Sequence, residues 1–431
     1  MAIARASSLL FRFAPIVSAG AFVLAGGTAV ASDASARPVA GAASATSSQL
    51  SLITEPNQGV APVLDAVQHA RRSVDVVMYE LEDKPLEAAL VVDEGHGVHV
   101  RVLLNGGYYG EGSSQNRAAY AYLKAHRVPV RWTPKHFALT HQKTVVVDDR
   151  AALILTFNLT PQYHSSSRDF GIADSNPADV RAIEGTFAND WNGAEATAGD
   201  GSGDLVWSPG SESTQIQTID SARGELDIYN EEMDDTAVEN ALEQAARRGV
   251  DVRVVMTYSP DWKSALEALA AAGVHVRTYT TDASLYIHAK MILSGGRALV
   301  ESENFSTTSL DRNRELGITV ASPRIVSSLK ATFEHDYAGA APFMKKSSTP
   351  KGSAAECSVT ASYSARYGDW DVYVHSDLPG QTATVTDSSG QSDSYHTSSV
   401  GYADVYFKAP ESAAGETVTV RVGSAACTAK L

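Results

Sequence analysis

Two short stretches of the sequence carry side chains that can act together on a phosphate ester. The first begins with His141 and Lys143, and the second begins with His288 and Lys290. In the first stretch a hydroxyl, an amide and an acid follow the histidine after 15, 17 and 28 residues, and in the second they follow after 14, 16 and 27. Matched spacing of five residue types indicates a duplicated site. The later residues are Thr156, Asn158 and Asp169 in the first stretch and Ser302, Asn304 and Glu315 in the second.

These residue types suit the cleavage of a phosphodiester, an anion with a poor leaving group. The lysines and amides supply positive charge and hydrogen-bond donors for the phosphate oxygens. One neutral imidazole can attack phosphorus, while the other, as an imidazolium, protonates the departing oxygen. A carboxylate that accepts a hydrogen bond from the far ring nitrogen fixes the tautomer, and Asp169 and Glu315 are the candidates, one for each histidine. This scheme requires neither a metal ion nor another cofactor.

The paired pattern resembles the phospholipase D superfamily, whose mark is H-x-K-x-x-x-x-D followed by a hydroxyl residue and an asparagine. Residues 141–148, HQKTVVVD, fit in full, with Asp148 as the structural aspartate of the motif. Residues 288–295, HAKMILSG, fit except at Gly295, where the family has aspartate. The resemblance covers roughly residues 50–340 and implies an α/β fold of two halves about a pseudo-twofold axis. It also implies catalytic roles for His141, Lys143, Asp169, His288, Lys290 and Glu315, and phosphate binding by Thr156, Asn158, Ser302 and Asn304.

Gly295 leaves two interpretations of the second half. Either this half is catalytically inactive and serves as a binding module, or the aspartate of the motif is mainly structural. Ser302, Asn304 and Glu315 are all present at the expected spacing, and a decayed site would be expected to lose them. The sequence therefore favours an active enzyme.

The two motifs lie in two copies of one α/β unit of about 145 residues. Residues 73–90 parallel residues 225–242, and residues 98–104 parallel residues 250–256. Hydrophobic spacing predicts helices and buried strands in alternation along the first half. The predicted helices are 60–70, 84–92, 115–125 and 177–191, the last matched by 323–337, and the predicted strands are 74–79, 98–104, 128–132, 144–147, 152–156 and 170–173.

Glu80 and Glu232 end the first long strands of the two halves at equivalent positions. They could border the site, although residues at such positions more often cap or pair structurally.

The N-terminal residues are typical of a secretory signal. Arg5 and Arg12 precede a mostly apolar run, and Ala29-Val30-Ala31 forms a small-x-small cleavage site. A membrane anchor is the alternative, but glycines shorten the apolar run below the ~20 residues that a spanning helix needs, and no other run is long enough. We therefore expect a secreted protein cleaved near Ala31. The predicted organisation is a signal peptide (1–31), a disordered leader (32–48), a first half (49–191), a linker (192–204), a second half (205–343), a linker (344–355) and a C-terminal module (356–431).

The C-terminal module alternates Thr, Val and Tyr with other residues and carries turn signals, which predicts a small antiparallel β-sandwich. Cys357 and Cys427 are the only cysteines of the chain and bracket this module. Secretion permits a disulfide between them, which would stabilise the module by about 4 kcal/mol in chain-entropy terms. Substrate or surface docking and a purely stabilising or spacer role both remain open.

The formal net charge of −15 counts against nucleic acid as the main partner. The leading hypothesis is a secreted phospholipase D that acts on glycerophospholipids at a membrane or vesicle surface as a monomer, with water or an alcohol as acceptor. By resemblance to secreted bacterial phospholipases D, His141 is the nucleophile and His288 the general acid. The alternatives are a secreted nuclease of the same superfamily and a non-catalytic phosphate-binding surface protein. A synthase making cardiolipin would normally need membrane-spanning segments.

Overall fold

The computed structural model describes residues 49–107, 114–161, 164–343, 357–364, 369–376, 378, 381–397 and 402–431. The predicted signal peptide, the leader and the 344–355 linker lie outside these residues. Within the described ranges, no helix combines the length and the apolar character needed to cross a membrane.

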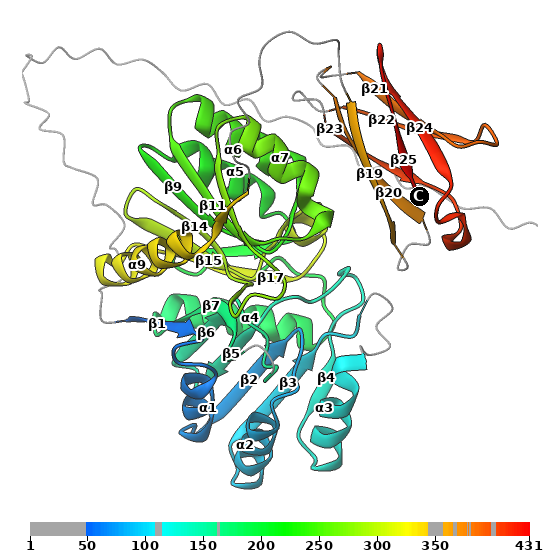
Figure 1. Cartoon of the computed structure of the whole chain (residues 1–431). Coiled ribbons are helices and arrows are strands. Elements are labelled where there is room, and N and C mark those ends of the chain that lie inside the picture. The colour runs from blue at the N-terminus through cyan, green and yellow to red at the C-terminus, as the bar shows by residue number, and fades with distance from the viewer. Residues whose placement is uncertain are drawn as a thin grey trace, which may run out of the picture. The chain divides into compact units, whose positions relative to one another are not determined.

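The first half is a mixed sheet with helices packed against it (Figure 1). Its strand order is β1-β7-β6-β5-β2-β3-β4. The apolar run at the centre forms β2, where Val74, Val76 and Met78 are fully buried. The strands are β1 (Leu50–Glu55), β2 (Ser73–Met78), β3 (His99–Leu104), β4 (Val130–Trp132), β5 (Thr144–Val147), β6 (Ala151–Leu155) and β7 (Ser167–Asp174), and the helices are α1 (Ala61–Gln68), α2 (Lys84–Gly95), α3 (Ser114–Ala125) and α4 (Pro177–Trp191).

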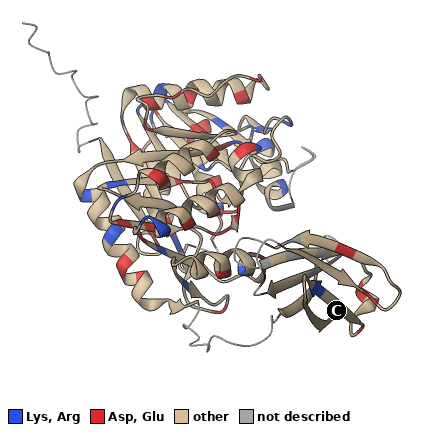
Figure 2. Ribbon diagram, turned by 90° about the horizontal axis from the view of Figure 1, so that it is seen from above, with Lys and Arg blue, Asp and Glu red and all other residues tan. Residues whose placement is uncertain are grey.

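The second half repeats this order as β18-β12-β11-β9-β14-β15-β17-β8. The strands are β8 (Leu205–Ser208), β9 (Glu225–Tyr229), β10 (Met233–Asp234), β11 (Asp251–Thr257), β12 (His275–Tyr279), β13 (Tyr286–Ile287), β14 (Lys290–Ser294), β15 (Arg297–Glu301), β16 (Phe305–Ser306), β17 (Glu315–Val320) and β18 (Ala341–Pro342). The helices are α5 (Glu212–Ser221), α6 (Thr236–Arg247), α7 (Lys263–Ala271), α8 (Thr307–Asp311) and α9 (Pro323–Gly339). Figure 2 shows acidic and basic residues interspersed along the ribbons.

Local capping explains where several of the predicted helices begin. Asp83 accepts a hydrogen bond from the backbone N–H of Leu86 at 2.8 Å, so α2 begins directly after it. Asn176 accepts from the N–H of Ala178 at 3.0 Å and is followed by the proline that opens α4. A capping oxygen followed by proline in the first turn is a strong helix start.

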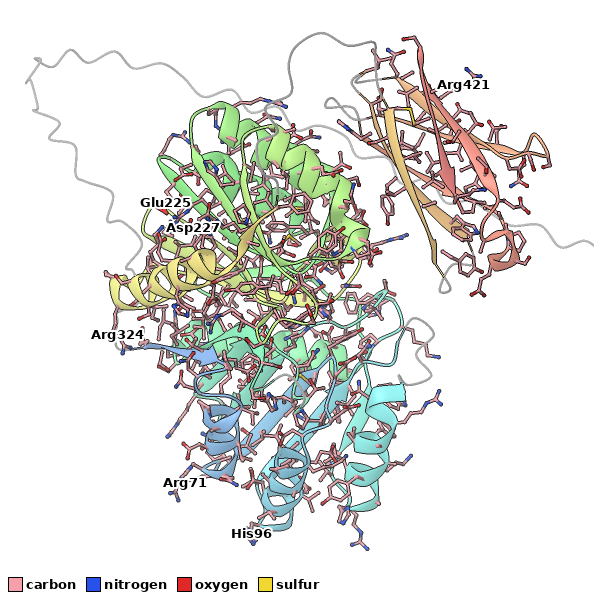
Figure 3. The ribbon with its side chains drawn as sticks, in the orientation of Figure 1. Arg71, His96, Glu225, Asp227, Arg324 and Arg421 are labelled. Carbon is pink, nitrogen blue, oxygen red and sulfur yellow. A yellow bond between two sulfur atoms is a disulfide. The ribbon has the colours of Figure 1, made fainter. Side chains whose placement is uncertain are left out.

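The duplication extends to side-chain contacts. Asp75 in β2 accepts from Arg101 in β3, whose guanidinium lies 4.7 Å from the Phe187 ring centroid. The second half repeats the ion pair with Asp227 in β9, which Figure 3 labels, and Arg253 in β11. The equivalent ring is Phe333, with its centroid 5.2 Å from that guanidinium. Such repeated contacts confirm the prediction of two copies of one unit.

Two kinds of contact join the halves. Strand β13 of the second half pairs in parallel with β7 of the first, extending that sheet. Two buried arginine–aspartate pairs then cross between the halves: Arg168 of β7 binds Asp336 of α9, and Arg314 next to β17 binds Asp190 of α4. In each pair two guanidinium nitrogens contact the two carboxylate oxygens. A core formed by apolar residues of both halves lies between α4 and α9.

The C-terminal module has its own apolar core between two antiparallel sheets, in the orders β19-β20-β23 and β22-β21-β24-β25. A disulfide joins Cys357 of β19 to Cys427 of β25, with their Cα atoms 5.7 Å apart. Both the sandwich and the disulfide were predicted from the sequence. The strands are β19 (Cys357–Ser364), β20 (Asp369–Ser376), β21 (Thr382–Thr386), β22 (Ser392–His396), β23 (Tyr402–Phe407), β24 (Thr417–Val422) and β25 (Ala425–Lys430).

Candidate active site

Each histidine–lysine motif lies at the start of a central strand. His141 and Lys143 immediately precede β5, and Lys290 is the first residue of β14 with His288 two residues before it. Residues two apart in extended chain point to the same side, which brings each lysine beside its own histidine. Lys143 Nζ donates to the backbone oxygen of His141 at 2.5 Å, and Lys290 Nζ donates to that of His288 at 2.6 Å.

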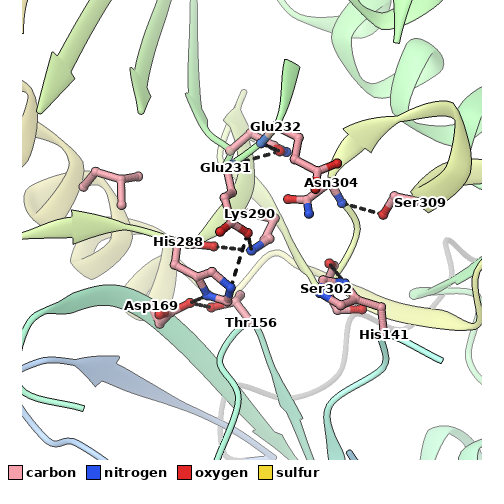
Figure 4. A network of polar contacts seen from close by, with 12 residues as sticks. His141, Thr156, Asp169, Glu231, Glu232, His288, Lys290, Ser302, Asn304 and Ser309 are labelled. Carbon is pink, nitrogen blue, oxygen red and sulfur yellow. Dashed lines mark hydrogen bonds and ion pairs between the residues drawn. The ribbon is translucent and has the colours of Figure 1, made fainter. Parts of the chain in front are cut away.

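Each histidine pairs with the acid of the other half. Nδ1 of His141 lies 2.8 Å from Oε2 of Glu315. Nδ1 of His288 lies 2.9 Å from Oδ1 of Asp169 (Figure 4). The four side chains are nearly or fully buried. A carboxylate at Nδ1 fixes the ring so that Nε2 is the nitrogen left for chemistry. Neither half alone holds a complete histidine–acid dyad.

Backbone hydrogen bonds also join each histidine motif to the other half. The N–H groups of His141 and Gln142 both donate to the carbonyl of Arg314, at 2.9 and 3.0 Å. The N–H groups of His288 and Ala289 donate to the carbonyl of Arg168, at 3.2 and 2.8 Å. Each arginine directly precedes the acid that orients the histidine, so one backbone junction positions both members of a dyad.

Hydroxyl and amide groups hold the two acids in place. Asp169 accepts from Ser167 and, at 2.5 Å, from Thr156. Glu315 accepts from Ser309 and, at 3.0 Å, from Asn313. Sequence reasoning missed Ser167, Ser309 and Asn313, because only Thr156 follows the spacing of the motif.

Three of the predicted phosphate-binding residues, Thr156, Ser302 and Asn304, lie at the site (Figure 4). Besides donating to Asp169, the Thr156 hydroxyl accepts from the N–H of Phe170 at 2.9 Å, and the Ser302 hydroxyl accepts from the N–H of Leu316 at 3.1 Å. Asn158 and Asn304 are buried, and their side-chain oxygens have no hydrogen-bond partner among the described residues. The two hydroxyls therefore support the neighbouring strand, and phosphate binding by any of the four stays a prediction.

Burial sets the charge of the first motif. It lowers the pKa of His141 to about 4, a shift that Glu315 opposes and Lys143 increases. Burial likewise lowers the pKa of Lys143 to about 7. His141 is therefore neutral at neutral pH, with a lone pair on one ring nitrogen.

The second motif has a different neighbour, Glu231, at the end of β9. Its Oε2 lies 2.9 Å from Lys290 Nζ and 3.3 Å from Nε2 of His288 (Figure 4). Burial alone would raise the pKa of Glu231, but His288 and Lys290 together lower it well below its ordinary value. From the sequence, Glu232 could border the site, but the adjacent Glu231 makes these contacts. The signal for it is the pair of equivalent positions that follow β2 and β9, which carry different residue types, Tyr79 and Glu231.

Among the described residues, no three His, Cys, Asp or Glu side chains are arranged to hold a metal ion. The chemistry that these residues can supply is one nucleophilic imidazole, one acidic imidazole and two ammonium groups, all close together.

Comparisons with known proteins agree with this geometry. The family described as "Cardiolipin synthase, PLD-like domain" matches twice, over residues 63–191 and 215–337. The chain belongs to the phospholipase D superfamily. Curated relatives include cardiolipin synthases of Listeria monocytogenes serotype 4a (26% identical, 46% of this chain and 47% of the relative) and Clostridium perfringens strain 13 (25%, 46% and 49%). The chain thus spans about half the length of the curated relatives it matches.

Solved structures share the phospholipase D fold at low identity. Phosphatidylserine synthase from Haemophilus influenzae has a TM-score of 0.52 at 11% identity, covering 68% of this chain and 86% of that one. Polyphosphate kinase from Porphyromonas gingivalis has a TM-score of 0.52 at 14% identity, covering 66% and 46%. Both likenesses concern the fold alone.

The phospholipase D motif aspartate has a structural place in this chain. Asp148 lies in the β5–β6 turn with φ 58° and accepts from the N–H groups of Arg71, Arg72 and Ser73. Gly295 occupies the equivalent β14–β15 turn with φ 57°. The departure at Gly295 therefore changes a turn at the opposite end of β14 from His288, which favours the structural interpretation of the missing aspartate.

Proposed function

We propose that this protein is a phosphodiesterase of the phospholipase D type, which removes the headgroup of glycerophospholipids through a phosphohistidine intermediate. The observation that carries the proposal is the pair of crossed dyads, each with Nδ1 on a carboxylate and Nε2 left for chemistry. Both histidines and Lys290 lie at one site (Figure 4), and Lys143 Nζ donates to the backbone oxygen of His141. Phosphodiester cleavage needs one nucleophile and one proton donor in such an arrangement.

In the first step Nε2 of His141 attacks phosphorus. The bond from phosphorus to the headgroup oxygen breaks, and Nε2–H of His288 gives its proton to that oxygen. The low pKa of His141 suits the nucleophile. His288 suits the acid because carboxylate oxygens of Asp169 and Glu231 face its two ring nitrogens, and an imidazole that donates from both nitrogens is positively charged.

In the second step neutral His288 takes a proton from water while the water oxygen attacks phosphorus. The phosphorus–nitrogen bond breaks, and its electron pair returns to Nε2 of His141. An alcohol in place of water gives transphosphatidylation. Lys143 and Lys290 stabilise the charge that develops on the phosphate oxygens in both steps.

The lipid substrate is favoured over nucleic acid by the net charge of −15. A nuclease would instead need a basic surface around the site. The non-catalytic alternative depended on Gly295, and the equivalence of its turn to that of Asp148 removes most of its support.

We also propose that the protein is exported and cleaved near Ala31. The disulfide supports this, since such bonds persist mainly in oxidising compartments. Mass spectrometry of the N-terminus of protein recovered from the culture medium tests it. Retention in the cytoplasm with an intact Met1 would contradict it.

The deciding experiment measures choline release from phosphatidylcholine vesicles by the purified protein in EDTA. We expect release that disappears in His141→Ala, a variant whose fold is checked by circular dichroism. Release restored by a divalent ion after loss in EDTA would contradict the metal-free mechanism. No release from phosphatidylcholine, phosphatidylglycerol or cardiolipin vesicles, together with cleavage of DNA, would replace the lipid proposal with the nuclease.

A further inference from the structure

The two halves place different side chains against their motifs. At the end of β2, the Tyr79 ring packs edge-on against His141, with ring centroids 4.5 Å apart, and lies 5.1 Å from Lys143 Nζ. At the equivalent end of β9 stands Glu231. The duplicated site is thus aromatic on one side and anionic on the other.

Glu231 contacts two groups that the proposed reaction uses. Its Oε2 contacts both Lys290 Nζ and His288 Nε2, the cation and the proton donor of the second half. Its Oε1 accepts from the Tyr286 hydroxyl at 2.7 Å, which holds the carboxylate in place. About a quarter of the Glu231 side chain (26%) remains exposed, so a ligand can reach it. The carboxylate oxygen therefore stands where a phosphate oxygen must bind.

A bound phosphate must displace this oxygen and then remain beside its charge. Like charges a few ångströms apart repel strongly in a partly desolvated site. A phosphodiester carries one negative charge, whereas a phosphomonoester carries close to two at neutral pH because its second pKa is about 6. The Glu231 carboxylate therefore repels a bound phosphomonoester more strongly than a bound phosphodiester.

We propose that Glu231 is a specificity-determining residue that favours singly charged phosphodiesters and disfavours doubly charged phosphomonoesters. This inference rests on the proposed function, because hydrolysis there converts a diester substrate into a monoester product. Glu231 then speeds release of the product by competing for Lys290 and His288 as the second charge appears. Tyr79, which carries no charge, exerts no such selection at the first motif.

The test compares two ligands that differ by one methyl group, methyl phosphate and dimethyl phosphate, by ³¹P NMR titration at pH 7.5. In Glu231→Gln we expect methyl phosphate to bind about tenfold more tightly, with a clearly smaller gain for dimethyl phosphate. Tyr286→Phe, which loosens the hold on Glu231 without altering its charge, should shift the ratio of the two affinities in the same direction by less. Glu334→Gln, on α9, removes one carboxylate elsewhere and should leave the ratio unchanged.

An unchanged ratio in folded Glu231→Gln overturns the inference, as does an equal gain for both ligands. If Glu231→Gln does not fold, Tyr286→Phe decides by the same ratio. The titration requires no turnover, so its outcome is separate from that of the choline assay. A protein inactive on every lipid that still shows the shift would contradict the proposed function while leaving the selectivity of Glu231 standing.

Discussion

The two oxygens of Glu315 have distinct partners. Oε1 accepts from the Ser309 hydroxyl and from Asn313 Nδ2, whereas Oε2 faces Nδ1 of His141. Both partners of Oε1 are donors, so that position must hold an acceptor. If Glu315 were replaced by glutamine, the amide oxygen would therefore take the Oε1 position and the amide nitrogen the Oε2 position.

This asymmetry makes Glu315→Gln a sharp probe of the nucleophile. Ser309 and Asn313 force the amide oxygen to the Oε1 position, so the amide nitrogen faces His141 and the ring proton moves to Nε2. The attacking lone pair is then lost, and we expect the release of p-nitrophenol from p-nitrophenyl phosphocholine to fall by on the order of 10³-fold or more, without a burst. His288→Ala should keep a burst on this substrate, because nitrophenolate leaves without a proton. A full burst in Glu315→Gln would show that His141 is not the nucleophile.

At the scale of secondary-structure elements, the β5–β6 and β14–β15 turns adopt the same backbone conformation with different residues. Asp148 combines a left-handed φ with three backbone hydrogen bonds, while Gly295 adopts the same φ without a side chain. Left-handed residues other than glycine are most often asparagine or aspartate. The motif aspartate therefore stabilises the turn and does not act in the catalytic site.

Gly295→Asp should therefore leave lipid hydrolysis within about twofold of the parent, since nothing lies within 4 Å of the added Cβ and aspartate tolerates this φ. Asp148→Ala should lower the free energy of unfolding by about 2 kcal/mol through the lost charge-assisted hydrogen bonds, with activity preserved below the melting temperature. Urea unfolding and initial rates measure the two effects. A gain in rate of tenfold or more in Gly295→Asp would instead mean that the second motif is catalytically impaired as it stands.

Two buried arginine–aspartate pairs join the halves. Arg314→Ala leaves Asp190 buried without its partner, so we expect a loss of about 3–5 kcal/mol in unfolding free energy. The double variant Arg314→Ala with Asp190→Ala should lose less than the sum of the two single changes, because no charge is left buried. Urea titration of the four proteins completes the cycle, and strict additivity would refute a direct coupling.

For the molecule as a whole, buried and partly buried carboxyl groups dominate the response to pH. Burial raises their pKa values to between about 6 and 8, so the folded chain holds protons that the unfolded chain has released. Stability from such groups is complete below their unfolded values near 4 and is lost as pH rises through the folded values. His164 acts in the same sense, with a pKa raised to about 9 by Asp83 and Glu55 against the effect of burial. The carboxyls are Glu55, Asp174, Glu184, Asp227, Glu232, Glu239 and Glu301.

The melting temperature should accordingly fall by several degrees between pH 5 and pH 8. His141 and Lys143, whose pKa values are lowered, act in the opposite sense but are outnumbered. Calorimetry across this range measures the slope, and Glu301→Gln should flatten it while the exposed Glu334→Gln should not. A melting temperature that rises with pH would contradict the assignment of these buried groups.

Local signals in the sequence were enough to predict most elements and the composition of the site. The periodicity of residues 60–70 and 144–147 anticipated α1 and β5, and matched spacing identified histidines and acids that the structure brings together. The crossing of the dyads could not be predicted, because it joins residues 174 and 119 apart in the chain through the packing of the two halves. The contacts of Glu231 with His288 and Lys290 could not be predicted either. The differing residue types at positions 79 and 231 mark the position, but they do not show which side chains it meets.

The crossed dyads also govern when the chain becomes chemically active. During synthesis the first half emerges with His141 and Asp169, yet their partners Glu315 and His288 lie in the second half. A chain that has folded only one half lacks the carboxylate that orients its histidine, so on the proposed mechanism it should not cleave a phosphodiester. In the proposed mechanism, hydrolysis would begin only once both halves have docked.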